Sequence, residues 1–118
     1  MSFEFNNNTP LYLQIVNIIA KEIVSGIINP GDKIPSVREY ALIFKVNPNT
    51  ICKALLLLED EKLIYTERTN GKFVTKEIDI INKYKEKYID EKVKNFVEEL
   101  KILGFSKEDI VSKILEDK

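Results

Sequence analysis

The chain has 118 residues, of which 44% are hydrophobic and 31% charged, enough for one compact domain with a short appendage. One cysteine and no histidine exclude an internal disulfide and remove the commonest metal ligand and general base. No glycine-rich phosphate loop is present, so we expect no enzyme and no metal or cofactor site. The polar N-terminus lacks a signal core, and no apolar run approaches the ~20 residues of a membrane span, so we expect a cytoplasmic protein without a membrane partner.

The net charge of −1 argues weakly against a nucleic-acid partner, but the charges are unevenly distributed. Residues 33–76 carry eight basic and five acidic side chains, a net charge of +3. Residues 77–118 carry nine lysines and eleven acidic side chains, a net charge of −2. A mildly basic middle joined to an acidic tail can still bind phosphate locally.

The first predicted helix covers residues 11–24, where apolar side chains recur at helical spacing. Thr9 provides a hydroxyl cap and Pro10 suits the first helical position. Residues 29–32 form a turn cluster. Residues 33–35 then form a short extended piece, because a residue before proline avoids the helical region.

Two further helices follow, joined by a tight link. Ser36 and Glu39 have the spacing of a capping box for a short helix that ends near Lys45. Asn47, followed by a proline, repeats the cap-plus-proline start of a third helix that runs to about Asp60.

A β-hairpin and a helical tail complete the chain. Extended runs at 63–67 and 72–75 flank an Asn-Gly pair, a strong hairpin signal. Apolar side chains at helical spacing predict a long helix over 80–103, and a capping box at Ser106 starts a last one. We therefore expect one domain over residues 1–77 and a two-helix module over residues 78–118.

Helix, short strand, helix, tight turn, helix and hairpin is the order of a winged helix-turn-helix, so the predicted fold is mainly α with a small β-hairpin wing. In that geometry the third helix enters the DNA major groove. Asn49, Thr50 and Lys53 share its outward side, and these residue types pair with adenine, guanine or phosphate. The inward stripe consists of Ile51, Ala54, Leu55 and Leu58.

Four fragments in this order resemble the GntR family of bacterial regulators, and within it the short YtrA-like subfamily. They are PLYLQIV at 10–16, GIINPGDKIPSVREYA at 26–41, VNPNTICKA at 46–54 and GKFV at 71–74. The resemblance implies a homodimeric repressor of double-stranded operator DNA, with control of a nearby transporter operon. It does not identify a small-molecule effector. The tail resembles the subfamily's compact dimerisation module.

The resemblance also implies individual DNA contacts. Arg38 falls where the family uses an arginine on base or backbone, and Gly71 falls at a wing tip that the family lays into the minor groove. Arg68 and Lys72 flank that tip and are either DNA contacts or ordinary hairpin charges. The full set of expected DNA-binding residues is Arg38, Asn47, Asn49, Thr50, Lys53, Arg68, Asn70, Gly71 and Lys72, with Asn47 primarily a helix cap.

The chain departs from the family pattern at several positions. Lys62 stands where a glycine usually ends the third helix, which predicts a left-handed backbone there. Leu56 and Leu57 replace polar residues, and we expect both to be at least partly buried against the tail or a second subunit. Cys52 is expected to be a small, partly buried packing residue.

The principal alternative to a DNA-binding regulator is a winged helix used only as a protein–protein module. The salt dependence of binding separates the two, because DNA binding weakens steeply as salt rises. If the tail helix packs on a symmetry mate, its wide apolar stripe is covered and the operator should be an inverted repeat.

Overall fold

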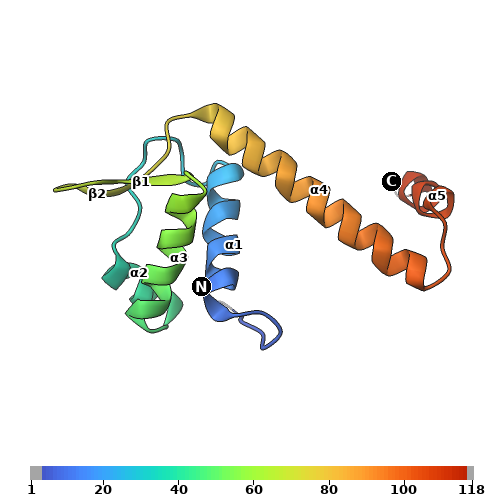
Figure 1. Ribbon diagram of the computed structural model, residues 1–118, viewed down its shortest axis with the longest axis horizontal. Helices are drawn as coiled ribbons and strands as arrows, with labels where there is room; N and C mark the ends of the chain where they lie inside the picture. The colour runs from blue at the N-terminus through green and yellow to red at the C-terminus, as the bar shows by residue number, and fades with distance from the viewer. Residues whose placement is uncertain (1–3, 117–118) are drawn as a thin grey trace. The chain divides into compact units, whose positions relative to one another are not determined.

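The computed structural model describes residues 4–116, which form helices and one two-stranded antiparallel sheet (Figure 1). The elements are α1 (Leu11–Val24), α2 (Val37–Phe44), α3 (Pro48–Asp60), β1 (Ile64–Glu67), β2 (Gly71–Val74), α4 (Ile78–Ile102) and α5 (Lys107–Glu116). The mainly helical fold with a hairpin wing is as predicted. Residues up to Asn82 and residues from Lys83 onwards form two compact units.

The core of the first unit lies between α1 and α3, which run side by side (Figure 1). Helical spacing places one apolar stripe of each helix in this contact. The hairpin adds further buried side chains at the end of α3. The most deeply buried side chains are Ile15, Ile19, Ile51, Leu55, Leu58, Leu63 and Val74. Each such side chain stabilises the fold by about 1.5–3 kcal/mol through burial.

Local hydrogen bonds set the geometry of the helix-turn-helix. The Ser36 hydroxyl accepts from the Glu39 amide at 3.1 Å, and the Glu39 carboxylate accepts from the Ser36 amide at 3.0 Å, so the expected capping box forms. The Asn47 side chain accepts from the Asn49 amide at 2.8 Å and caps α3. The axes of α2 and α3 turn by 115° across the short link, within the range of helix-turn-helix motifs.

Lys62 has a φ of 62°, so the expected left-handed backbone is confirmed. The Lys62 amide donates to the Glu59 carbonyl at 2.9 Å, and the Leu63 amide donates to the Leu58 carbonyl at 3.0 Å. These two bonds make a Schellman motif, with Leu58 and Leu63 in the core. Lys45, which follows α2, has a φ of 58° and provides a second left-handed position that the sequence did not reveal.

The hairpin pairs Ile64 with Val74 and Glu67 with Gly71 across a three-residue loop. Gly71 opens β2 with a φ of 108°, which a residue with a side chain rarely adopts. The extended piece expected at 33–35 is present, because Lys33 forms a β-bridge with Phe73 on the free edge of β2. The wing is therefore joined directly to the segment that leads into α2.

The start of α1 differs from the prediction. Pro10 occupies the N-cap with a ψ of 138°, and no side chain caps the helix, so Thr9 is not the cap. The Gln14 side chain instead donates to the Thr9 carbonyl at 2.7 Å and to the Asn6 carbonyl at 2.9 Å. A long side chain reaching back from the second turn thus anchors the preceding loop, which a short cap pattern does not predict.

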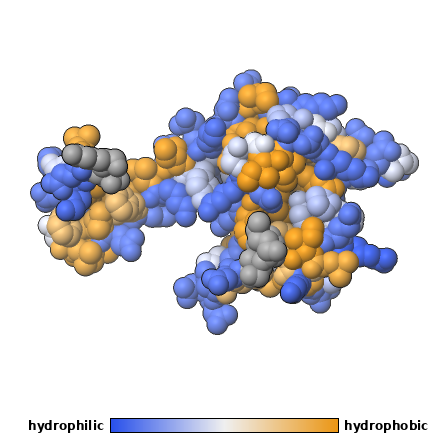
Figure 2. Space-filling view, turned by 180° about the vertical axis from the view of Figure 1, so that it is seen from behind, coloured by the Kyte–Doolittle hydropathy of each residue, from blue (hydrophilic) through white to orange (hydrophobic). Residues whose placement is uncertain are grey.

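In the second unit, α4 ends before Gly104, which has a φ of 96°. Ser106 and Asp109 then form the expected capping box of α5, with bonds of 2.9 and 3.1 Å. Exposed apolar side chains gather on these helices (Figure 2). They are Ile89, Val93, Phe96, Ile102, Leu103, Phe105, Val111, Ile114 and Leu115. In the single chain, the apolar stripe expected on the long helix is therefore exposed, and a partner could cover it.

Across residues 4–116, no single helix has the length and apolar character needed to cross a membrane. The bent pair of α2 and α3 passes that test by length and composition only.

Candidate nucleic-acid interface

The outward face of α3 carries polar side chains close to its N-terminus. Asn49 and Lys53 are exposed and Thr50 is half-buried, while Ile51 and Ala54 on the other side of the helix are fully buried. The dipole of α3 adds a positive potential at the same end, although the first-turn amides of Asn49 and Thr50 are bonded to Asn47. The structure thus brings three of the expected contact residues onto one surface beside an anion-attracting helix end.

The Lys53 ammonium lies over the ring of Tyr12, 4.1 Å from the ring centroid. Tyr12 is a half-buried residue in the first turn of α1. An ammonium above an aromatic face is attracted by the ring quadrupole and keeps its full charge, whereas a carboxylate partner would neutralise it. Sequence reasoning missed Tyr12, because only the packing of α1 on α3 brings the two side chains together.

Arg38 and Asn47 lie at the two helix starts of the motif. Arg38 is exposed on the first turn of α2, between the two residues of the capping box. The Asn47 side-chain oxygen is occupied by the cap of α3. The structure therefore supports the role of Asn47 as the N-cap of α3 and shows no second role for its side-chain oxygen.

At the wing tip, Arg68 is exposed in the loop between β1 and β2. The Asn70 side chain donates to the Glu67 carboxylate at 3.1 Å, and the Asn70 amide donates to the Glu67 carbonyl at 3.2 Å. Asn70 thus closes the loop that precedes Gly71. Gly71 then provides the positive φ with which β2 begins.

Lys72 behaves differently from the other expected contact residues. Its ammonium forms an ion pair and hydrogen bond with the Glu59 carboxylate at the end of α3, and also donates to the Thr66 hydroxyl at 2.8 Å. Thr66 in turn donates to Glu59 at 2.9 Å. The hydrogen bond from Lys72 is the main cause that lowers the pKa of Glu59. This triad ties both wing strands to α3.

Two side chains near this surface differ from their expected burial. Cys52 is exposed and not a packing residue, because it follows the inward Ile51 and turns out of the core. Leu57 is half-buried as expected, but Leu56 is 60% exposed in the single chain. Helical phase from Ile51 could have placed Cys52 outside, whereas burial of Leu56 requires a partner.

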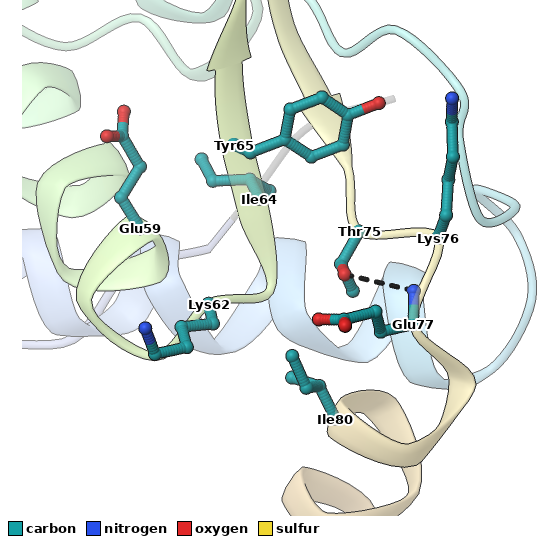
Figure 3. Close-up of a pocket in the computed structure, with 8 residues that line it drawn as sticks. All are labelled: Glu59, Lys62, Ile64, Tyr65, Thr75, Lys76, Glu77 and Ile80. Atoms are coloured by element: carbon teal, nitrogen blue, oxygen red, sulfur yellow. Dashed lines mark hydrogen bonds between the residues drawn. The ribbon is translucent and has the colours of Figure 1, made fainter.

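An open hollow of about 470 Å³ lies where β1 and β2 meet the first turn of α4. Its lining residues are Glu59, Lys62, Ile64, Tyr65, Thr75, Lys76, Glu77 and Ile80 (Figure 3). The side chains of Lys62 and Lys76 extend away from each other, and the Thr75 hydroxyl accepts from the Glu77 amide at 3.1 Å. The hollow therefore gathers no convergent charge for a small ligand. Residues 4–116 also contain no group of three side chains suited to hold a metal.

Comparison with known proteins agrees with this geometry. Residues 11–74 match the family model "Bacterial regulatory proteins, gntR family". The chain is 38% identical over 114 residues to YhcF, a helix-turn-helix regulator of Bacillus subtilis, covering 97% of this chain and 94% of YhcF. It is 45% identical over 69 residues to the B. subtilis transcriptional repressor YtrA, covering 58% of this chain and 53% of YtrA.

A solved GntR-family transcriptional regulator from Listeria monocytogenes superposes with a TM-score of 0.89 at 38% identity, covering 97% of this chain and 100% of that one. The similarity therefore extends through the winged helix and the two C-terminal helices. These relatives are transcriptional regulators and not enzymes. The chain belongs to the GntR family of bacterial regulatory proteins, whose members bind DNA through a winged helix-turn-helix.

Proposed function

We propose that this protein is a cytoplasmic repressor that binds an inverted-repeat operator as a homodimer. The observation that carries the proposal is the outward face of α3, where Asn49, Thr50 and Lys53 stand beside a capped helix start. A helix set at 115° to the preceding one can enter the major groove with its N-terminal residues at the base edges. The repressor role is proposed from the similarity to YtrA.

The proposed contacts have distinct roles. Asn49 pairs with a base edge, Lys53 contacts guanine or a phosphate, and Thr50 and Arg38 reach base or backbone. Asn47 acts through its cap on α3. Gly71 lets the wing tip enter the minor groove beside Arg68.

The proposed dimer forms through residues 78–118. In the single chain, α4 and α5 expose large apolar side chains that include Val93, Phe96 and Ile114. A second copy of the chain presents the same self-complementary stripe, so a two-fold pairing of these helices covers both. A sedimentation measurement should give a dimer at micromolar concentration without DNA. A monomer under these conditions would contradict the proposed assembly.

The DNA-binding experiment uses the full chain and a duplex from the intergenic region upstream of its gene. Arg38→Ala and Lys53→Ala should each weaken binding while the thermal unfolding midpoint stays unchanged, because both side chains are exposed. Loss of a base contact costs about 1–3 kcal/mol of discrimination, whereas loss of a phosphate contact lowers affinity evenly on all sequences. Lys85→Ala, an exposed lysine on α4, is the matched control. Unchanged affinity in both test variants would remove the proposed surface.

The regulated genes are proposed from the family resemblance to be a neighbouring transporter operon. Deletion of the gene should raise the transcript of that operon, and unchanged transcript levels of its neighbours would contradict the assignment. Footprinting on the same upstream region should show two related protected half-sites.

The second candidate function is a protein–protein module without DNA binding. It is favoured by the exposed apolar side chains of Leu42 and Ile43 on α2 and Leu56 on α3, which could contact a protein partner. Steep weakening of DNA binding between about 50 and 200 mM salt supports the first candidate. Absence of any salt-sensitive DNA binding supports the second.

A further inference from the structure

The wing contains a lysine whose charge is already used within the protein. The Lys72 ammonium is bound by the Glu59 carboxylate and the Thr66 hydroxyl, and its side chain is only 26% exposed. A lysine that is paired with a carboxylate of the same protein does not neutralise a DNA phosphate. It therefore releases few counterions from DNA when the protein binds. The sequence alone leaves Lys72 as either a DNA contact or an ordinary hairpin charge.

A different segment supplies backbone along the outer edge of the wing. The Ile34 amide donates to the Lys72 carbonyl at 2.9 Å, and the Val74 amide donates to the Asp32 carbonyl at 2.8 Å. Between them, Lys33 forms its β-bridge with Phe73. These bonds hold the backbone of Lys33 against the outer edge of β2.

The Lys33 side chain runs to the wing tip. A Cβ atom added at Gly71 would lie 3.1 Å from the Lys33 Cε and 3.7 Å from its Nζ. The ammonium of Lys33 therefore lies beside the backbone of the tip, and a Cβ at position 71 would press on the Lys33 Cε by a few tenths of an ångström. Gly71 makes room for this lysine in addition to providing a φ of 108°.

The charge of Lys33 is available to a partner outside the protein. Lys33 is exposed, and across residues 4–116 no carboxylate lies within ion-pair distance of it. Hydrogen bonds from Ser36 lower the pKa of Glu39, and the charge of Lys33 lowers it further. The Glu39 carboxylate remains engaged in the capping box of α2.

We propose that Lys33, with Arg68, provides the DNA-binding charge of the wing tip, while Lys72 positions the wing through Glu59. This inference rests on the proposed DNA-binding function. Lys33 contacts phosphates that border the minor groove next to the tip. A phosphate contact carries no sequence information directly, so Lys33 contributes equally on operator and on random DNA.

The experiment compares three full-length proteins by fluorescence anisotropy on the upstream duplex and on a random duplex, between 50 and 200 mM salt. They are the wild type, Lys33→Gln, and the double variant Glu59→Gln with Lys72→Gln, which removes the internal pair without leaving a lone charge. Each lost phosphate contact lowers the slope of log K against log salt by about 0.9, or about 1.8 for a dimer. When salt rises from 50 to 200 mM, the fold-decrease in DNA affinity should be about 12 times smaller for Lys33→Gln than for the wild type.

The double variant should keep the wild-type salt slope, and Lys33→Arg should keep it too because it retains the charge. Lys33 is exposed, so neither change at this position threatens the fold, and circular dichroism checks this. A wild-type slope in Lys33→Gln, or an equal decrease in the double variant, would overturn this inference alone. If the wild type binds neither duplex, the proposed function fails and this inference fails with it.

Discussion

Replacing Lys62 by glycine should stabilise the protein, although it deletes a side chain. Lys62 has a φ of 62°, and a residue with a side chain pays about 1–2 kcal/mol in this left-handed region. Glycine removes that strain but loses about 0.5–1 kcal/mol through the greater freedom of the unfolded chain. The Schellman hydrogen bonds of residues 62 and 63 use backbone atoms and stay. At the centre of the two ranges the net gain is about 0.75 kcal/mol, which raises the Tm of a unit of this size by about 3–6 °C.

The assay is urea denaturation followed by circular dichroism at one fixed protein concentration, since the proposed dimer makes stability depend on concentration. Lys62→Ala is the control, because it removes the same charge and the same long side chain but keeps the Cβ atom. The control should show no gain. If Lys62→Ala stabilises as much as Lys62→Gly, the gain comes from the lost charge and the argument from backbone strain is wrong.

Three further predictions concern other side chains. Tyr40 is 3% exposed, burial raises the pKa of its hydroxyl, and this hydroxyl has no hydrogen-bond partner among the described residues. Tyr40→Phe should therefore raise the free energy of unfolding by about 1 kcal/mol. A lower free energy of unfolding in urea denaturation would show that the hydroxyl does have a partner. Tyr12→Leu should weaken DNA binding and Tyr12→Phe should not, because only the second keeps the aromatic ring under Lys53. A double-mutant cycle of Tyr12→Leu with Lys53→Ala should give a coupling of about 0.5–1 kcal/mol in the free energy of DNA binding, and a coupling of zero would show that the two residues act independently. The pKa of Glu59 lies below its ordinary 4.5 in the folded protein, so its stabilising effect is present above pH 4.5 and is lost as pH falls through the folded value. Stability should therefore drop less on acidification in Glu59→Gln than in the wild type, and equal drops would contradict the role of its pair with Lys72.

Much of the fold could be predicted because its signals are local. The capping boxes at Ser36 and Ser106 place two helix starts from side chains only three residues apart. The left-handed Lys62 could also be predicted, because it stands where the family pattern has the glycine that ends the third helix. Thr9 shows the limit of this reasoning, because the adjacent Pro10 takes the cap position itself.

The missed features depend on packing between distant segments. Tyr12 reaches Lys53 only because α1 lies against α3, and Glu59 reaches Lys72 only because the hairpin folds back on α3. Neither of these two contacts follows from helical or strand periodicity. The sequence therefore indicated candidate DNA-binding residues on α3 and the wing, but it could not predict which of their charges are engaged within the protein.

The placement of Lys33 against Gly71 has a consequence for how the wing varies among relatives. A side chain at position 71 would bring its Cβ to 3.1 Å from the Lys33 Cε, so the end of the Lys33 side chain would have to shift by a few tenths of an ångström. Substitutions at these two positions should therefore occur together: a relative with a larger residue at the tip should carry a shorter residue before α2. Transplanting the hairpin loop alone into another winged helix would leave behind the lysine that lies across it. An exchange of wings between relatives should thus include residues 32–34 as well as the hairpin.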